Sequence, residues 1–131
     1  MSRDTLTDTE SAGGTRYSEG KPSGWWFAPL KGLELIMPVA TAGAKKYAPK
    51  DWLVGQSYST LLDCGMRHMI QVMHYGVEAK DAETGHLHLA HATWNFLALL
   101  TFMALGRDDL DDVSVWDGVT AAERDSVDAK W

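Results

Sequence analysis

The sequence predicts an all-α protein, a small bundle of three main helices and a short C-terminal helix that oligomerisation completes. Apolar residues recur at helical spacing in several segments, whereas no segment shows the strand-like alternation of apolar and polar residues and no internal repeat is present. The chain has 131 residues, of which 45% are hydrophobic. This length and composition are typical of one globular domain with a modest core.

The first predicted helix begins at Pro29 and carries apolar residues at helical spacing: Leu30, Leu33, Met37 and Ala40. Pro38 lies inside this pattern and predicts a kink or a restart, because proline lacks the amide donor of the helical hydrogen bond. The segment continues to Tyr47, and Pro49 ends it. Residues 51–56 form a short connection.

The second predicted helix has Ser57 or Ser59 as its N-cap and runs to about Tyr75, before Gly76. Its apolar face combines six residues at helical spacing: Tyr58, Leu61, Leu62, Gly65, Met69 and Val72. Because His68 shares a face with Leu61, Gly65 and Val72, we expect it to point inward and to meet the third helix.

The third predicted helix is capped by Thr84 and extends to Leu105, with Gly106 just beyond its end. From Trp94 onward its only polar members are Asn95 and Thr101. A helix that is apolar all round belongs in the centre of a bundle or at a subunit interface. In the tail, the capping-box sequence of residues 120–123 predicts a short terminal helix.

The formal net charge of −6 arises mostly from the tail. Residues 1–106 hold ten acidic and nine basic side chains (net −1), whereas residues 107–131 hold eight and three (net −5). An acidic chain is not typical of a nucleic-acid binder, whose footprint is basic, so we expect no direct nucleic-acid binding.

One cysteine and a polar N-terminus without an apolar signal segment favour the cytoplasm. The longest apolar stretch is too short to span a membrane, so no membrane partner is expected.

All five histidines lie between positions 68 and 91. His88, His91 and Asn95 have the spacing i, i+3, i+7, which places them on one helix face, where two imidazoles can share a divalent cation. We place His86 in the first turn of this helix, with Asp81 and Glu83 just before it. Because carboxylates suit Mg²⁺ and Mn²⁺ and imidazoles suit softer metals, a mixed ligand set favours Mn²⁺ or Fe²⁺ over Mg²⁺.

These histidines also have structural interpretations. A single buried histidine such as His68 is more often a hydrogen-bonded core residue than a ligand, and His74 suits the C-terminal end of its helix as a favourable charge. Neither a phosphate-binding loop, nor a dinucleotide-binding glycine pattern, nor a nucleophile elbow is present. The lone Cys64 is a poor candidate for a nucleophile. The expected chemistry is therefore metal-assisted catalysis or binding alone.

Four sequence blocks, in order, resemble those of a known family: residues 14–22, residues 43–52, Arg67-His68, and residues 81–95. The chain is similar to the phage dATP/dGTP diphosphohydrolase-like proteins (MazZ-like), which are related to the all-α nucleotide pyrophosphatases of the MazG type. The resemblance covers residues 13–106. Composition and charge divide the chain into an N-terminal arm (1–24), a helical core (25–106) and an acidic tail (107–131). The arm is either a flexible leader or a segment whose Gly/Arg/Lys motif contacts a ligand.

The resemblance implies a homo-oligomer that cleaves a deoxynucleoside triphosphate between its α and β phosphates, with Mg²⁺ or Mn²⁺. MazG-type enzymes hold their metals mainly with carboxylates, whereas this chain has Glu34 as the only acidic residue of its first helix and His88 and His91 at the later position. The predicted metal ligands are accordingly Glu34, Glu83, His88 and His91. The predicted catalytic residues add two others to these four, namely His68 and Asn95.

The substrate-binding prediction combines cations for the phosphates with aromatic rings for the base. A triphosphate carries about four negative charges, which a nearly neutral body must meet with local positive charge or metal. The available cations in the matching blocks are Arg16, Lys21, Lys45, Lys46 and Arg67, and the rings that can stack on a base are Tyr17, Tyr47 and Trp52.

Two other functions stay open at this point. The sparse carboxylate set favours a non-catalytic phage protein that binds and sequesters a signalling nucleotide. Alternatively, the protein is a structural or partner-binding helical protein, whose histidines belong to its core and whose six tryptophans form an interface.

Overall fold

Helices make up the fold, as the sequence predicts. The computed structural model describes residues 14–113 and 121–128, and their α-helices are α1 (Leu30–Lys46), α2 (Tyr58–Tyr75), α3 (His88–Ala104) and α4 (Ala121–Asp128). Within these residues no β-strand occurs, only an isolated antiparallel bridge between Lys80 and Leu87. The chain divides into two compact units, Met1–Glu34 and Leu35–Trp131, which are described separately.

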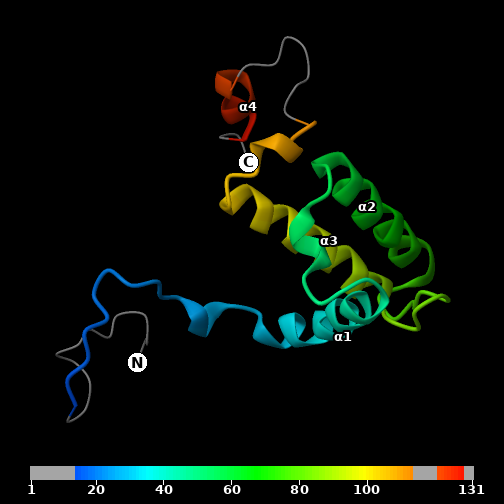
Figure 1. Ribbon diagram of the computed structural model, residues 1–131, viewed down its shortest axis with the longest axis horizontal. Coiled ribbons are helices and arrows are strands. Elements are labelled where there is room, and N and C mark those ends of the chain that lie inside the picture. Colours follow the sequence, from blue (N-terminus) through cyan, green and yellow to red (C-terminus); the bar gives the residue numbers. More distant parts are fainter. Residues whose placement is uncertain (1–13, 114–120, 129–131) are drawn as a thin grey trace. The chain divides into compact units, whose positions relative to one another are not determined.

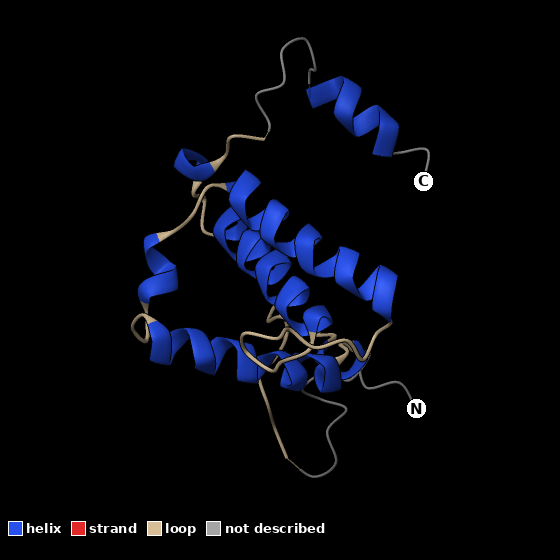
Figure 2. Ribbon diagram, turned by 90° about the vertical axis from the view of Figure 1, so that its right-hand side faces the viewer, coloured by secondary structure: helices blue, strands red, loops and turns tan. Residues whose placement is uncertain are grey.

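Helices α2 and α3 lie side by side in opposite directions and form the centre of the second unit (Figures 1 and 2). One core cluster combines Tyr58 and Leu61 of α2 with Ala98 and Phe102 of α3. Further along α2, a Cβ atom at Gly65 would lie 2.4 Å from the ring of Phe96, so the absence of a side chain permits this close approach. The same packing brings α2 against the beginning of α3.

The boundaries and the buried face of α2 confirm the sequence prediction. Ser57 is the N-cap, and its hydroxyl oxygen accepts a hydrogen bond from the Thr60 amide. Gly76 follows the helix with a φ of 97°, a conformation that favours glycine. The buried residues Tyr58, Leu61, Gly65 and Val72 all belong to the predicted apolar face.

Helix α1 differs from its prediction in continuity and in its buried face. It continues through Pro38 without the expected restart. Its buried residues are Ile36 and Val39, which pack with Ala90 of α3, whereas Met37 of the predicted apolar series is exposed. This packing on both sides of Pro38 holds the helix together despite the missing amide donor.

The prediction that Thr84 caps α3 is wrong, because the helix begins four residues later, at His88. The Asp81 carboxylate accepts hydrogen bonds from the amides of Glu83 and Thr84, and this local turn replaces the expected first helical turn. His86 therefore lies in the loop before α3. At the other end, Gly106 follows the helix with a φ of 70°, as expected.

The segment after α3 is hydrogen-bonded to the N-terminal end of α2. The Tyr58 hydroxyl donates to the Arg107 carbonyl at 3.1 Å, and both the amide and the hydroxyl of Ser59 donate to the Asp112 carboxylate. These hydrogen bonds from Ser59 lower the pKa of Asp112. The start of the predicted acidic tail thus contributes contacts to the helical core.

The predicted terminal helix is present as α4, while its capping residue Thr120 lies outside the described residues. Residues 1–13 of the N-terminal arm, and residues 114–120 and 129–131 of the acidic tail, also lie outside the described residues. Among the described helices, none combines the length and the apolar character that crossing a membrane requires.

Candidate functional site

Two histidines from different helices meet where α2 packs against the beginning of α3. The Nδ1 atoms of His68 and His88 lie 2.9 Å apart, so that one ring donates a hydrogen bond and the other accepts it. Asp81, from the loop before α3, completes the group: one ligand atom from each of the three residues lies within 4.8 Å of the others. All three residues are half-buried. His68 therefore meets the third helix, as its position on α2 predicts.

The electrostatic environment keeps His68 and Asp81 in forms that can bind a cation. Burial lowers the pKa of His68, and the neighbouring His88 lowers it further. Burial raises the pKa of Asp81, but hydrogen bonds from the amides of Thr84 and Glu83 outweigh it, and the net shift is downward. At neutral pH the group thus offers a neutral His68 imidazole and an ionised carboxylate, which are the metal-binding forms of these side chains.

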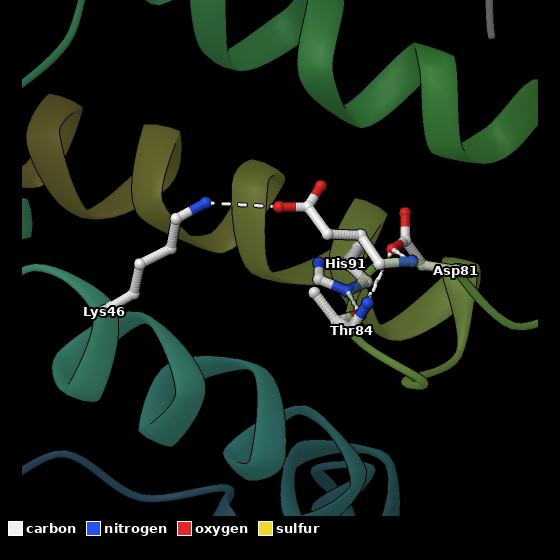
Figure 3. A network of polar contacts seen from close by, with 5 residues as sticks. Lys46, Asp81, Thr84 and His91 are labelled. Carbon is white, nitrogen blue, oxygen red and sulfur yellow. Dashed lines mark hydrogen bonds and ion pairs between the residues drawn. The ribbon is translucent and has the colours of Figure 1, made fainter.

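His91 of α3 contacts both the histidine group and the loop before the helix, and Figure 3 shows it beside Thr84 and Asp81. Its ring stacks on His68, with centroids 4.5 Å apart and planes 11° from parallel. Its Nε2 atom lies 2.7 Å from the Thr84 hydroxyl, which anchors the ring to the loop that carries Asp81. Burial, and then His68, lower the pKa of His91. Its contacts fix the orientation of both His68 and the loop.

A cation from α1 joins the same loop. The Lys46 ammonium group donates a hydrogen bond to the Glu83 carboxylate at 3.3 Å, which Figure 3 shows as a dashed line from Lys46. A side-chain hydrogen bond with Tyr47, and then Glu83, raise the pKa of Lys46. The Glu83 amide in turn donates to Asp81. Lys46 is therefore linked through Glu83 to the Asp81 carboxylate.

Five of the predicted site residues in the second unit form one continuous set of contacts: Lys46, His68, Glu83, His88 and His91. The remaining ones have other contacts. The Asn95 side chain donates to the His91 carbonyl at 2.9 Å, the Arg67 guanidinium lies 3.0 Å from the Cys64 sulfur, and the Trp52 ring packs against Phe102. Lys45 and Tyr47 are exposed near the end of α1.

Four further predicted residues belong to the first unit, Met1–Glu34. Arg16, Tyr17 and Lys21 are exposed, and the Lys21 amide closes a turn with the Ser18 carbonyl at 3.0 Å. The Glu34 carboxylate pairs with Lys31 at 3.0 Å on an exposed turn of α1. The roles of these residues toward a nucleotide or a metal stay predictions.

Neither Asp81 nor His68 is among the metal ligands predicted from the sequence, which are Glu34, Glu83, His88 and His91. The sequence places Asp81 before the third helix and His68 on an inward face, but their convergence depends on the loop conformation and on helix packing. A helical spacing pattern detects ligands within one helix only. The Asp-x-x-Thr sequence at residues 81–84 is the signal that could have indicated a carboxylate fixed by its own backbone.

A hollow with a volume of about 340 Å³ lies at the opposite end of the α2–α3 pair from the histidines. Its walls combine apolar side chains with two carboxylates: Tyr58, Leu62, Leu99, Met103, Asp108, Asp111 and Val113. Negative carboxylates repel a triphosphate. The histidine group is therefore the better candidate for a nucleotide site.

Comparison with protein-family models gives one match, which covers most of the chain. A family described as dATP/dGTP diphosphohydrolase, N-terminal, matches residues 11–112. These residues include the whole histidine group, the loop before α3 and Lys46. Comparisons with curated proteins and with solved structures found no match.

Proposed function

The chain belongs to the dATP/dGTP diphosphohydrolase N-terminal family, and from this membership we propose that it hydrolyses dATP and dGTP to the monophosphate and pyrophosphate with the help of a divalent metal ion. The observation that carries the proposal is the convergence of His68, Asp81 and His88 inside the matched region. Phosphate-ester hydrolysis commonly uses metal ions held by such side chains.

The donor set fits a divalent metal ion, and Mn²⁺ and Mg²⁺ are the two ions that we propose for the reaction. Two imidazole nitrogens and one carboxylate oxygen are ordinary ligands, and three protein ligands leave positions for water and substrate. When bound, the ion neutralises phosphate charge and lowers the pKa of a bound water. We assign its binding to His68, Asp81 and His88 in place of Glu34, Glu83 and His91, because only the former three are seen to converge in the described part of the chain.

The other histidine and the loop position these ligands. His91 stacks on His68 and contacts the Thr84 hydroxyl, while the amides of Glu83 and Thr84 hold the Asp81 carboxylate. Such outer contacts commonly change metal affinity or activity by about 10–100-fold when removed. We therefore assign His91 a positioning role, and we assign Glu83 the pairing with Lys46.

Lys46 is the cation best placed for the substrate phosphates. Its ion pair with Glu83 is exposed, and exposed pairs contribute little stability, so a triphosphate can displace Glu83 from the ammonium group. We propose additional phosphate contacts from Lys45 and Arg67 and from the arm residues Arg16 and Lys21, with Tyr17, Tyr47 or Trp52 stacking on the base. In this organisation residues 1–24 form an arm with a ligand-contacting Gly/Arg/Lys motif, residues 25–106 form the pyrophosphohydrolase-like core, and residues 107–131 form the acidic tail.

Replacing Lys46 by glutamine is expected to raise KM for dGTP about tenfold while kcat stays within about twofold. A lost charge-assisted hydrogen bond costs about 1.5–3 kcal/mol, and a contact made equally in ground and transition states affects KM alone. Lys50→Gln is the matched control, since Lys50 is also exposed and lies just beyond α1. Steady-state kinetics of both variants test this role, and an unchanged KM for Lys46→Gln would exclude it.

We propose that the protein self-associates. Near the end of α3, Leu100, Met103 and Leu105 expose 62%, 58% and 61% of their surface. Exposed apolar residues on a helix that is apolar all round support an interface with a second copy. Light scattering at several protein concentrations tests this proposal.

The alternative function is a non-catalytic protein that sequesters a nucleotide. One observation favours it, namely that Asp81 is the only carboxylate of the ligand group. The test is a panel of nucleoside triphosphates with Mg²⁺ and with Mn²⁺, in which phosphate, pyrophosphate and bound nucleotide are all measured. We expect pyrophosphate from dATP and dGTP. Tight binding without product would favour sequestration, and neither binding nor product would contradict both functions.

A further inference from the structure

The donor atoms of the histidine group define which metals it accepts. We infer that His68, Asp81 and His88 form a site that selects a first-row transition-metal ion, such as Mn²⁺ or Co²⁺, over Mg²⁺. The inference deepens the proposed function and rests on it for the expectation that a metal is used. It concerns the ligands themselves and can be tested without nucleotide or turnover.

The first argument is the chemistry of the ligands. Two of the three donors are imidazole nitrogens, from His68 and His88. Imidazole suits transition metals, whereas Mg²⁺ is bound through oxygen atoms and keeps several of its waters. A site for Mg²⁺ would be expected to contain more carboxylates than Asp81 alone. The affinity of such mixed sites generally rises from Mn²⁺ to Co²⁺ along the first-row series.

The second argument is the distance between the two nitrogens. Metal–nitrogen bonds of about 2.0–2.1 Å place neighbouring ligands of an octahedral ion roughly 3.0 Å apart, since they subtend a right angle at the ion. The two Nδ1 atoms are 2.9 Å apart. An ion bound by both nitrogens takes the place of the proton in this hydrogen bond, and the proton is released to solvent. The separation of the two nitrogens already suits two ligands of one ion.

The third argument is that the ligands are held in place. The His68 ring is covered by His91, and the Asp81 carboxylate accepts two backbone amides of its own loop. The other two histidines do not belong to the group: the His86 ring lies 6.3 Å from His91, and His74 lies beside Tyr75 on an exposed turn of α2. A preorganised ligand set enforces its preference among metals better than a flexible one.

The first experiment measures metal binding by the intact chain without nucleotide. Calorimetric titration with Mn²⁺, Co²⁺ and Mg²⁺ is expected to give one strong site per chain, with a Kd for Mn²⁺ at least about tenfold below that for Mg²⁺ and a still lower Kd for Co²⁺. In parallel, NMR of the imidazole nitrogens should show Co²⁺ perturbing His68 and His88 strongly and His74 little. Equal affinities for Mn²⁺ and Mg²⁺, or Co²⁺ effects centred on other histidines, would overturn the inference.

Variants then assign the preference to the ligands. His88→Ala should weaken Co²⁺ binding at least about tenfold, whereas His74→Ala, its matched control on α2, should leave it unchanged. His68→Asp should lower the preference for Mn²⁺ over Mg²⁺ at least about tenfold, because it replaces a nitrogen donor by oxygen. Circular dichroism checks that each variant is folded. An unchanged preference in folded His68→Asp would overturn the inference, while selective metal binding without pyrophosphate release would contradict only the proposed function.

Discussion

Replacing His88 by alanine is expected to lower kcat/KM for dGTP by about 100-fold or more. The substitution removes a proposed metal ligand and leaves His68 Nδ1 without its partner at 2.9 Å. Metal ions stabilise the charge that develops on phosphate oxygens by several kcal/mol, and each 1.4 kcal/mol corresponds to a factor of ten in rate. Pyrophosphate release measured at fixed metal concentration and at several dGTP concentrations gives the change in kcat/KM.

The matched control for this variant is His86→Ala. His86 lies two residues before His88, in the loop that precedes α3, and does not belong to the group of converging ligands. It should retain activity within a few-fold of the wild-type protein. Wild-type activity in folded His88→Ala, or an equal loss in His86→Ala, would place the reaction elsewhere in the chain.

Replacing Phe102 by alanine is expected to lower the free energy of unfolding by about 3–5 kcal/mol, as is typical of a buried phenylalanine. Phe102 is only 2% exposed, packs with Tyr58 and Leu61 of α2, and contacts the Trp52 ring. Its removal leaves a cavity in the core that joins α2 to α3. Urea denaturation followed by circular dichroism measures the change.

Val54→Ala is the control for stability. Val54 is 75% exposed, so the substitution removes little buried area. Its free energy of unfolding should stay within about 0.5 kcal/mol of the wild-type value. A loss below about 1 kcal/mol in Phe102→Ala would contradict the packing of α2 against α3. The position of His68 opposite His88 depends on that packing.

The sequence predicts α2 best, because its signals are local and agree with one another. A serine cap, a glycine at the end and one apolar face define the helix from Tyr58 to Tyr75. The beginning of α3 could not be predicted in the same way. The Thr84 sequence is suitable for a cap, but its amide donates to Asp81 and its hydroxyl contacts His91, a residue seven positions later.

The sequence predicts which site residues share a helix face, but not which residues of different elements come into contact. The spacing of His88 and His91 correctly places both on α3, and the inward face of α2 correctly includes His68. The contact between the His68 and His88 rings depends on the close approach of α2 and α3 at Gly65, and the position of Asp81 depends on the loop before α3. Two of the predicted metal ligands, Glu34 and Glu83, instead pair with lysines in the described structure.

The proposed reaction of this chain is the cleavage of dATP and dGTP between the α and β phosphates. Identification of the products by anion-exchange chromatography, with dGTP and Mn²⁺ and with His88→Ala in parallel, tests it most directly. We expect equal amounts of dGMP and pyrophosphate from the wild-type chain, and almost none of either product from His88→Ala. Release of dGDP and phosphate, or no turnover of either nucleotide with Mn²⁺ or Mg²⁺, would contradict it.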